Sequence, residues 1–132
     1  DMVLIDGLSG LKISLQGDEQ RLVRRLHALT RELKNHGVSV IITDETDQLT
    51  GSHRATSENT SYLADNILFL SYVELSGELN RSIGVLKKRL GGFDGRFHEF
   101  SIVEEEGVVI GEPFENVQGV LHGQPSNVRR DP

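Results

Sequence analysis

An aspartate follows the first apolar run of the chain. Residues 2–5 read Met-Val-Leu-Ile, and Asp6 comes directly after them. In open α/β sheets, ligands bind beyond the carboxyl ends of the strands. A carboxylate at that place can hold magnesium through water and offset phosphate charge. Because aspartate also caps turns, the pattern alone leaves a metal ligand and a turn cap as alternatives.

A run of three basic residues near a glycine-rich corner contains a second candidate group. Lys87, Lys88 and Arg89 end an alternating apolar stretch shortly before Gly91 and Gly92. In a regular strand Lys87 and Arg89 share one face, and Lys88 points the other way. Arginine offers planar bidentate contacts and lysine a point charge, so the pair suits a phosphate group. The alternative is an edge strand protected by charge.

Several other patterns carry weaker signals. Residues 44–61 are polar and rich in hydroxyls, which favours turn formers over phosphoacceptors. No spacing among the five histidines suits zinc, so surface positions are expected for all of them: His27, His36, His53, His98 and His122. The stretch 7–10 partly matches the G-x-S-x-G elbow of α/β-hydrolases, but position 11 is Leu. A phosphate-binding loop, G-x-x-x-x-G-K-[ST], is absent from the 132 residues.

The first half of the chain predicts a strand, a helix and a second strand. The first strand covers residues 2–5 and is followed by a polar connection through Gly17. Asp18 is the expected N-cap of a helix that ends at Gly37. Four leucines recur at helical spacing in it: Leu22, Leu26, Leu29 and Leu33. Residues 38–43 form the next strand, so a parallel crossover would bring Thr43 and Asp6 to one sheet edge.

The second half predicts antiparallel hairpins. A strand runs from 67 towards 74, turns at Ser76-Gly77 and returns over 80–88. Strands near 97–103 and 108–110 follow, separated by a turn over 104–107. We expect an α/β fold with a parallel β-α-β core and later hairpins. One domain should cover residues 1–121, with a polar tail or linker over 122–132.

The composition limits the class of protein. The net charge of −6 argues against an extended nucleic-acid surface, and the chain has no cysteine for a disulfide or thiolate site. No apolar run approaches the length of a membrane span. We therefore expect a cytoplasmic protein that binds neither DNA nor a membrane. Because Asp1 stands directly at a core-type strand, a fragment is expected, whose exposed strand edge would favour a dimer or swapped oligomer.

Four stretches resemble one family. "YVELSGELNRSIGVLKKRLGGFDGRFHEFSI" at 72–102 resembles the C-terminal half of KaiC-type circadian clock ATPases of the RecA superfamily, closest to their second, autokinase repeat. Three further stretches agree: "VLIDGLSGL" at 3–11, "LADNILFLSYVE" at 63–74 and "GEPFENVQGVLHGQPS" at 111–126. The resemblance thus covers nearly the whole chain and implies a partial RecA-like fold whose Walker A part is missing.

The resemblance also implies site residues and partners. It implies a hexameric ring with ATP between subunits, and clock or signalling proteins as possible partners. Asp6 matches the Walker B acid that binds Mg²⁺ through water. Lys87 and Arg89 match a K-x-R segment acting in trans on the neighbour's nucleotide, and Arg21 matches a further interface arginine. The phosphoacceptor candidates on this comparison are Ser61, Thr60 and Thr56.

The sequence departs from the family pattern at three places. Gly7 stands where Ser or Thr usually follows the Walker B acid, Phe93 replaces a nucleotide-side histidine, and Tyr62 replaces the threonine of the phosphorylation pair. The expected function is the C-terminal part of a KaiC-like ATPase, with Ser/Thr autokinase activity in the full ring and none in this chain alone. The alternatives are a non-catalytic oligomerisation module and an α/β-hydrolase fragment.

Overall fold

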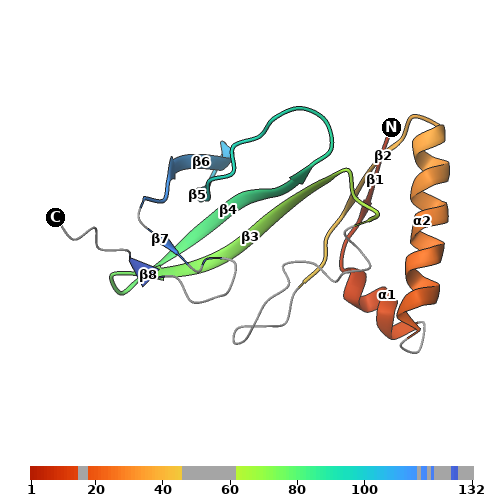
Figure 1. The fold of residues 1–132 in the computed structure, drawn as a ribbon, viewed down its shortest axis with the longest axis horizontal. Coiled ribbons are helices and arrows are strands. Elements are labelled where there is room, and N and C mark those ends of the chain that lie inside the picture. The colour runs from red at the N-terminus through yellow and green to blue at the C-terminus, as the bar shows by residue number, and fades with distance from the viewer. Residues whose placement is uncertain (15–17, 46–61, 116, 119, 121–125, 128–132) are drawn as a thin grey trace. The chain divides into compact units, whose positions relative to one another are not determined.

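The helices and strands fall into two compact units (Figure 1). The computed structural model describes residues 1–14, 18–45, 62–115, 117–118, 120 and 126–127. The first unit contains β1 (Met2–Ile5), α1 (Leu8–Ser14), α2 (Glu19–Asn35) and β2 (Ser39–Ile42). The second contains β3 (Asn66–Leu75), β4 (Glu78–Lys88), β5 (His98–Val103), β6 (Gly107–Pro113), β7 (Val117–Gln118) and β8 (Ser126–Asn127). The mixed α/β class is confirmed.

The first unit is the predicted parallel β-α-β arrangement. β1 and β2 pair in parallel, from Met2 opposite Ser39 to Ile5 opposite Ile42. Asp18 caps α2, because its side chain accepts a 2.9 Å hydrogen bond from the Arg21 N–H. Gly37, after the helix, has a φ of +70°, a conformation that glycine adopts at little cost. Both predicted helix ends are therefore confirmed.

The core of the first unit lies between the helices and one face of the strand pair. Leu8, Leu22 and Leu26 are 2–4% exposed, and Ile5, Ile42 and Leu63 pack against them. Leu22 and Leu26 are one helical turn apart, so they present one apolar stripe. The other face of the strand pair is open: Met2, Leu4 and Ile41 are 66%, 65% and 46% exposed.

Helix α1 corrects one prediction. Residues 6–17 were expected to form a polar connection, yet Leu8–Ser14 is helical. Gly10 lowers the intrinsic helix propensity of this segment, so its local sequence does not indicate a helix. Leu8 is 2% exposed in the core, and its N–H donates to the Thr43 carbonyl at 3.0 Å. Tertiary packing of Leu8 therefore fixes the helix.

The second unit is built on an antiparallel sheet with strand order β3-β4-β5-β6. Ser76 and Gly77 join β3 to β4, and their φ values of 55° and 83° are those of a two-residue hairpin turn. The predicted hairpin at this dipeptide is confirmed. The β5–β6 turn falls at residues 104–106, also as predicted.

A β-bulge interrupts the β3–β4 ladder near its open end. Leu68 lies opposite Val85, whereas Ile67 lies opposite Lys87, so Leu86 is the extra residue. Because alternate residues of a strand face opposite sides, the bulge changes the side of the sheet on which Lys87 lies. Lys87 therefore shares the face of Ile67 rather than that of Val85.

Close packing in the second unit centres on Gly84. Phe69 lies opposite Gly84 in the ladder, and the rings of Phe69 and Phe97 meet edge to face at 6.2 Å and 80°. A Cβ atom at Gly84 would lie 2.5 Å from Cε1 of Phe97, so the Phe97 ring occupies the space of a side chain there.

The last described strands lie in the terminal part of the sequence. β7 pairs with β8 in antiparallel fashion, so Ser126 and Asn127, in the stretch predicted as a polar tail, form a strand. The domain end at residue 121 stays a prediction. Within the described residues, the structure has no helix with the length and apolar character needed to span a membrane.

Candidate functional site

Asp6 and Thr43 meet where β1 and β2 end. The Thr43 hydroxyl donates a 2.6 Å hydrogen bond to Oδ1 of Asp6. The same hydroxyl accepts a 2.9 Å hydrogen bond from the N–H of Gly7. Parallel pairing places the carboxyl ends of both strands at one edge, which is why residues 37 positions apart come together. The hydroxyl fixes the orientation of the Asp6 carboxylate.

The backbone of Thr43 strengthens this arrangement. Its N–H donates to the Ile5 carbonyl at 3.0 Å, and its carbonyl accepts from the Leu8 N–H at 3.0 Å. Thr43 therefore contacts the chain on both sides of Asp6, before and after it. Gly7 has a φ of +79°, a conformation that favours glycine and turns the chain from β1 towards α1.

The Asp6 carboxylate fits a water-bound magnesium ion. Asp6 is exposed, and a carboxylate whose Oδ1 accepts one hydrogen bond keeps further acceptor capacity. Mg²⁺ keeps several waters and takes one or two carboxylates in nucleotide sites. No group of three or more His, Asp or Glu in the described part of the chain could hold a metal. The donor set therefore suits a mostly hydrated ion and not a site closed by protein ligands.

Arg21, the third predicted contact, lies in the first turn of α2. Its backbone N–H is bonded to the Asp18 cap, and the residue is exposed. Asp44 and Glu45, the acids after β2, are exposed as well. Arg21 and Asp6 both belong to the first unit, whereas Lys87 and Arg89 belong to the second.

Arg89 is bound to Asp65 within the second unit. Nη1 of Arg89 lies 2.7 Å from Oδ1 of Asp65. The backbone N–H of Arg89 donates to the backbone carbonyl of Asp65 at 2.9 Å. Lys88 donates from Nζ to the Gly92 carbonyl at 2.9 Å, which ties the strand end to the glycine corner. Lys87 is half-buried. The basic segment Lys87–Arg89 is thus at the open end of the β3–β4 hairpin, whereas Arg21 lies in α2.

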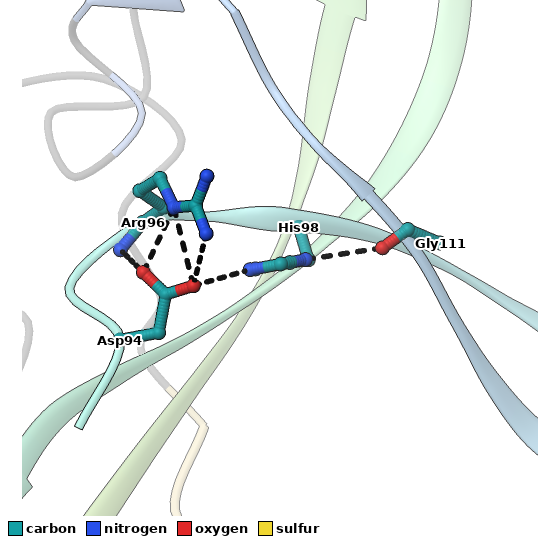
Figure 2. A network of polar contacts seen from close by, with 4 residues as sticks. All are labelled: Asp94, Arg96, His98 and Gly111. Atoms are coloured by element: carbon teal, nitrogen blue, oxygen red, sulfur yellow. Dashed lines mark hydrogen bonds and ion pairs between the residues drawn. The ribbon is translucent and has the colours of Figure 1, made fainter.

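A second polar network follows the glycine corner (Figure 2). The Asp94 carboxylate accepts a hydrogen bond from Nη2 of Arg96 at 2.7 Å and another from the backbone N–H of Arg96 at 3.0 Å. His98 lies between two acceptors: Nε2 is 3.2 Å from Oδ2 of Asp94, and Nδ1 is 3.0 Å from the Gly111 carbonyl. Only a doubly protonated imidazole can donate to both. The network ties the corner to β5 and β6.

Electrostatics in this network follow from its contacts. Hydrogen bonds from the Arg96 side chain and N–H hold the pKa of Asp94 well below its ordinary range, and Asp94 raises the pKa of Arg96 in return. His27 and His36 are exposed, as predicted, but the side chain of His98 is only 22% exposed. For His98 the surface prediction holds only in part, because its side chain is half-buried. The alternation Asp94, Arg96, His98 was the available signal, since it places three polar residues on one face.

The remaining candidates are placed as follows. The predicted phosphoacceptors Ser61, Thr60 and Thr56 lie outside the described residues, and so do His53 and His122. Tyr62, next to Ser61, is 83% exposed. Ser9 lies within α1 rather than on the strand-to-helix turn that a nucleophile elbow requires, so the hydrolase interpretation loses its basis.

Comparisons with known proteins agree on one family. The KaiC ATPase family model matches residues 1–115. The chain is 33% identical over 129 residues to the circadian clock oscillator protein KaiC of Thermostichus vulcanus, covering 98% of this chain and 24% of the relative. It is 36% identical over 125 residues to the circadian clock protein KaiC3 of Synechocystis sp., covering 93% of this chain and 24% of that protein.

The chain spans about a quarter of the length of these relatives. The match includes β1 with Asp6, β2 with Thr43 and the hairpin that carries Lys87 and Arg89. The predicted resemblance is confirmed, and with it the RecA-like α/β class. This chain belongs to the KaiC ATPase family.

Proposed function

We propose that this chain is the C-terminal portion of a KaiC-like ATPase domain that binds ATP with Mg²⁺. The observation that carries the proposal is the Asp6 carboxylate, held by Thr43 at the end of β1 in a chain whose residues 1–115 match the family. Asp6 holds the ion through water. Lys87 and Arg89, with Arg21, contact the phosphates of a nucleotide bound by the neighbouring subunit of a hexameric ring.

The chemistry needs positioning and charge more than covalent catalysis. When bound, Mg²⁺ neutralises charge on the phosphate oxygens. The chain's own residues orient and neutralise: Thr43 holds the Asp6 carboxylate in one direction, and Arg89 offers a planar guanidinium. A phosphate-binding loop is absent from these 132 residues, so in this proposal the loop lies elsewhere in a longer cytoplasmic protein.

ATP hydrolysis by the full-length protein tests the proposal. Asp6→Asn keeps the size of the side chain and removes its charge, so hydrolysis should fall by about 10²-fold or more. Asp18→Asn is the matched control, because asparagine caps a helix as well as aspartate does, and its activity should stay unchanged. Equal hydrolysis by wild type and Asp6→Asn would contradict the proposal.

Autophosphorylation is a second part of the proposal. Ser61 matches the serine of the family's phosphorylation pair, with Thr60 and Thr56 nearby in the sequence. The full-length protein, incubated with ATP and Mg²⁺, should carry phosphate at Ser61 and lose it in Ser61→Ala. Phosphopeptide mapping that finds no phosphate at any of these hydroxyls would remove the kinase activity from the proposal and leave the ATPase in place.

An oligomerisation module is the alternative, and the open face of the β1–β2 pair favours it. Met2, Leu4 and Ile41 are large, apolar and 46–66% exposed, which is typical of surfaces that contact another chain. The 132-residue chain alone should form a dimer or swapped oligomer through this region. Sedimentation should show the oligomer, and Leu4→Thr should shift it towards monomer. A wild-type monomer at all concentrations would contradict this.

A further inference from the structure

Asp65 contacts Arg89 through both its side chain and its backbone. Asp65 directly precedes β3, Arg89 directly follows β4, and Asn66 lies opposite Lys88 in the last rung of the ladder. The two residues therefore occupy the next position beyond the ladder. Two contacts join them, an ion pair of 2.7 Å and a backbone hydrogen bond of 2.9 Å. The backbone bond fixes the Cα of Arg89, and the ion pair directs its guanidinium.

The bulge at Leu86 makes this pairing possible. Past the bulge, Ile67 is opposite Lys87, and residues opposite each other in an antiparallel pair share a face. Alternation then places Arg89 on the face of Asp65. If Leu86 were instead paired with Ile67 in a regular ladder, the register would shift by one, Lys88 would lie level with Asp65, and Arg89 would lie on the other side of the sheet. The bulge thus directs Lys87 and Arg89 towards the face of Asp65.

The Asp65–Arg89 ion pair orients the arginine without holding it strongly. The side chains are 67% exposed for Arg89 and 38% for Asp65, and exposed ion pairs of this kind contribute little to stability. A phosphate group carries more charge than one carboxylate and matches the guanidinium fork. Arg89 can therefore exchange the carboxylate for a phosphate at little cost.

We propose that Asp65 is a positioning residue for Arg89. It holds the guanidinium in place before nucleotide binds and gives it up to a phosphate oxygen of the nucleotide. The inference rests on the proposed function of Arg89 as a phosphate contact. A purely structural role, as a clamp at the open end of the hairpin, is the alternative, and it predicts an effect of Asp65 that does not depend on Arg89.

A double-mutant cycle on ATP hydrolysis by the full-length protein separates these roles. Asp65→Asn should lower kcat about tenfold with a smaller change in KM, because the guanidinium is less well oriented. In an Arg89→Lys background the same change should have no further effect. Glu74→Gln, which removes an exposed acid from the same strand β3, is the matched control and should leave kcat unchanged. Asp65→Ser, checked by circular dichroism, repeats the test with a second side chain.

Three outcomes would overturn the inference, and they differ in what they say of the ATPase. If Arg89→Lys lowers hydrolysis and Asp65→Asn does not, Asp65 has no positioning role and the proposed function stands. If Asp65→Asn lowers kcat equally in both backgrounds, its role is structural only. If Arg89→Lys itself leaves hydrolysis unchanged, the proposed phosphate contact fails and the inference fails with it.

Discussion

The two units hold their charged side chains in different ways. In the first unit, the Asp6 carboxylate is oriented by a neutral hydroxyl, that of Thr43 at 2.6 Å. In the second unit, Arg89 and Arg96 are each paired with a carboxylate, from Asp65 and Asp94, at 2.7 Å in both cases. A hydroxyl fixes direction and leaves the charge in place, whereas a carboxylate fixes direction and offsets the charge.

The difference indicates how each unit can receive a ligand. Asp6 keeps its negative charge available to a cation while its geometry is already set, which is the condition for pre-organised binding. If Arg89 contacts a phosphate as proposed, it has to leave the Asp65 carboxylate first, so its binding would be an exchange. Arg96 has a further carboxylate contact and a backbone contact to the same residue, so its pairing is the more permanent one.

Arg89→Ala and Arg96→Ala separate the exchangeable arginine from the structural one. In the full-length protein, Arg89→Ala should lower kcat for ATP hydrolysis on the order of 10³-fold, the effect of removing a phosphate-binding arginine supplied in trans. Arg96→Ala, the matched control in the same unit, should leave kcat within about twofold of wild type, as expected of a residue outside the reaction. Equal losses of kcat in both variants would contradict the distinction between an exchangeable Arg89 and a structural Arg96.

Thr43→Val tests the orienting hydroxyl of the first unit. Valine keeps the shape and removes the bond to Oδ1 of Asp6, so hydrolysis should fall by about 10–100-fold, the usual effect of losing a residue that orients a metal ligand. Thr43→Ser keeps the hydroxyl and should recover most of the activity. If valine is as active as serine, orientation of Asp6 does not depend on this bond.

Gly84→Ala tests the packing that supports the hairpin of the second unit. The added Cβ would lie 2.5 Å from the Phe97 ring, and overpacking of this kind lowers the free energy of unfolding by about 1–3 kcal/mol. Gly92→Ala is the control, because nothing lies within 4 Å of its added Cβ. Urea denaturation measures both. An unchanged midpoint for Gly84→Ala would mean that Phe97 moves aside without cost.

The pH dependence of stability in the Asp94→Asn variant tests the Asp94–Arg96 ion pair. Because the pKa of Asp94 is held below its ordinary value of 3.8, its stabilising contribution is fully present above that value and is lost as pH falls below it. Wild type should therefore lose stability faster than Asp94→Asn between about pH 4 and pH 2. The effect should be small, since Asp94 is well exposed. Glu78→Gln, another exposed acid, should retain the wild-type acid dependence in denaturation experiments.

The sequence predicted most of the fold because its local signals agree with the tertiary structure. Asp18 and Gly37 mark the ends of α2, and Ser76-Gly77 marks the hairpin turn, each through side-chain or backbone chemistry at one position. Helix α1 was missed because its stability comes from Leu8 in the core, a contact with residues far away in the chain. Local propensity cannot report such a contact.

The candidate site was predictable to a similar degree. The meeting of Asp6 and Thr43 follows from parallel pairing alone. The partner of Arg89 was not predictable, because it depends on the register of the ladder at its open end and on one extra residue, Leu86. The apolar alternation of residues 80–88 does not indicate the bulge, because the same residues would also fit a regular strand.

That extra residue has a consequence for how this hairpin can vary. Deleting Leu86 would make the ladder regular and would keep Lys87 opposite Ile67 and Lys88 opposite Asn66, on the side of the sheet where they lie now. Inserting one residue between Ile67 and Leu68, opposite the bulge, would instead move the Lys87–Arg89 segment onto the side of the sheet where Val85 lies. The side of the sheet on which Lys87 and Arg89 lie therefore depends on the number of residues in each strand as well as on their identity. A one-residue insertion in β3 would change that side while every charged side chain is retained.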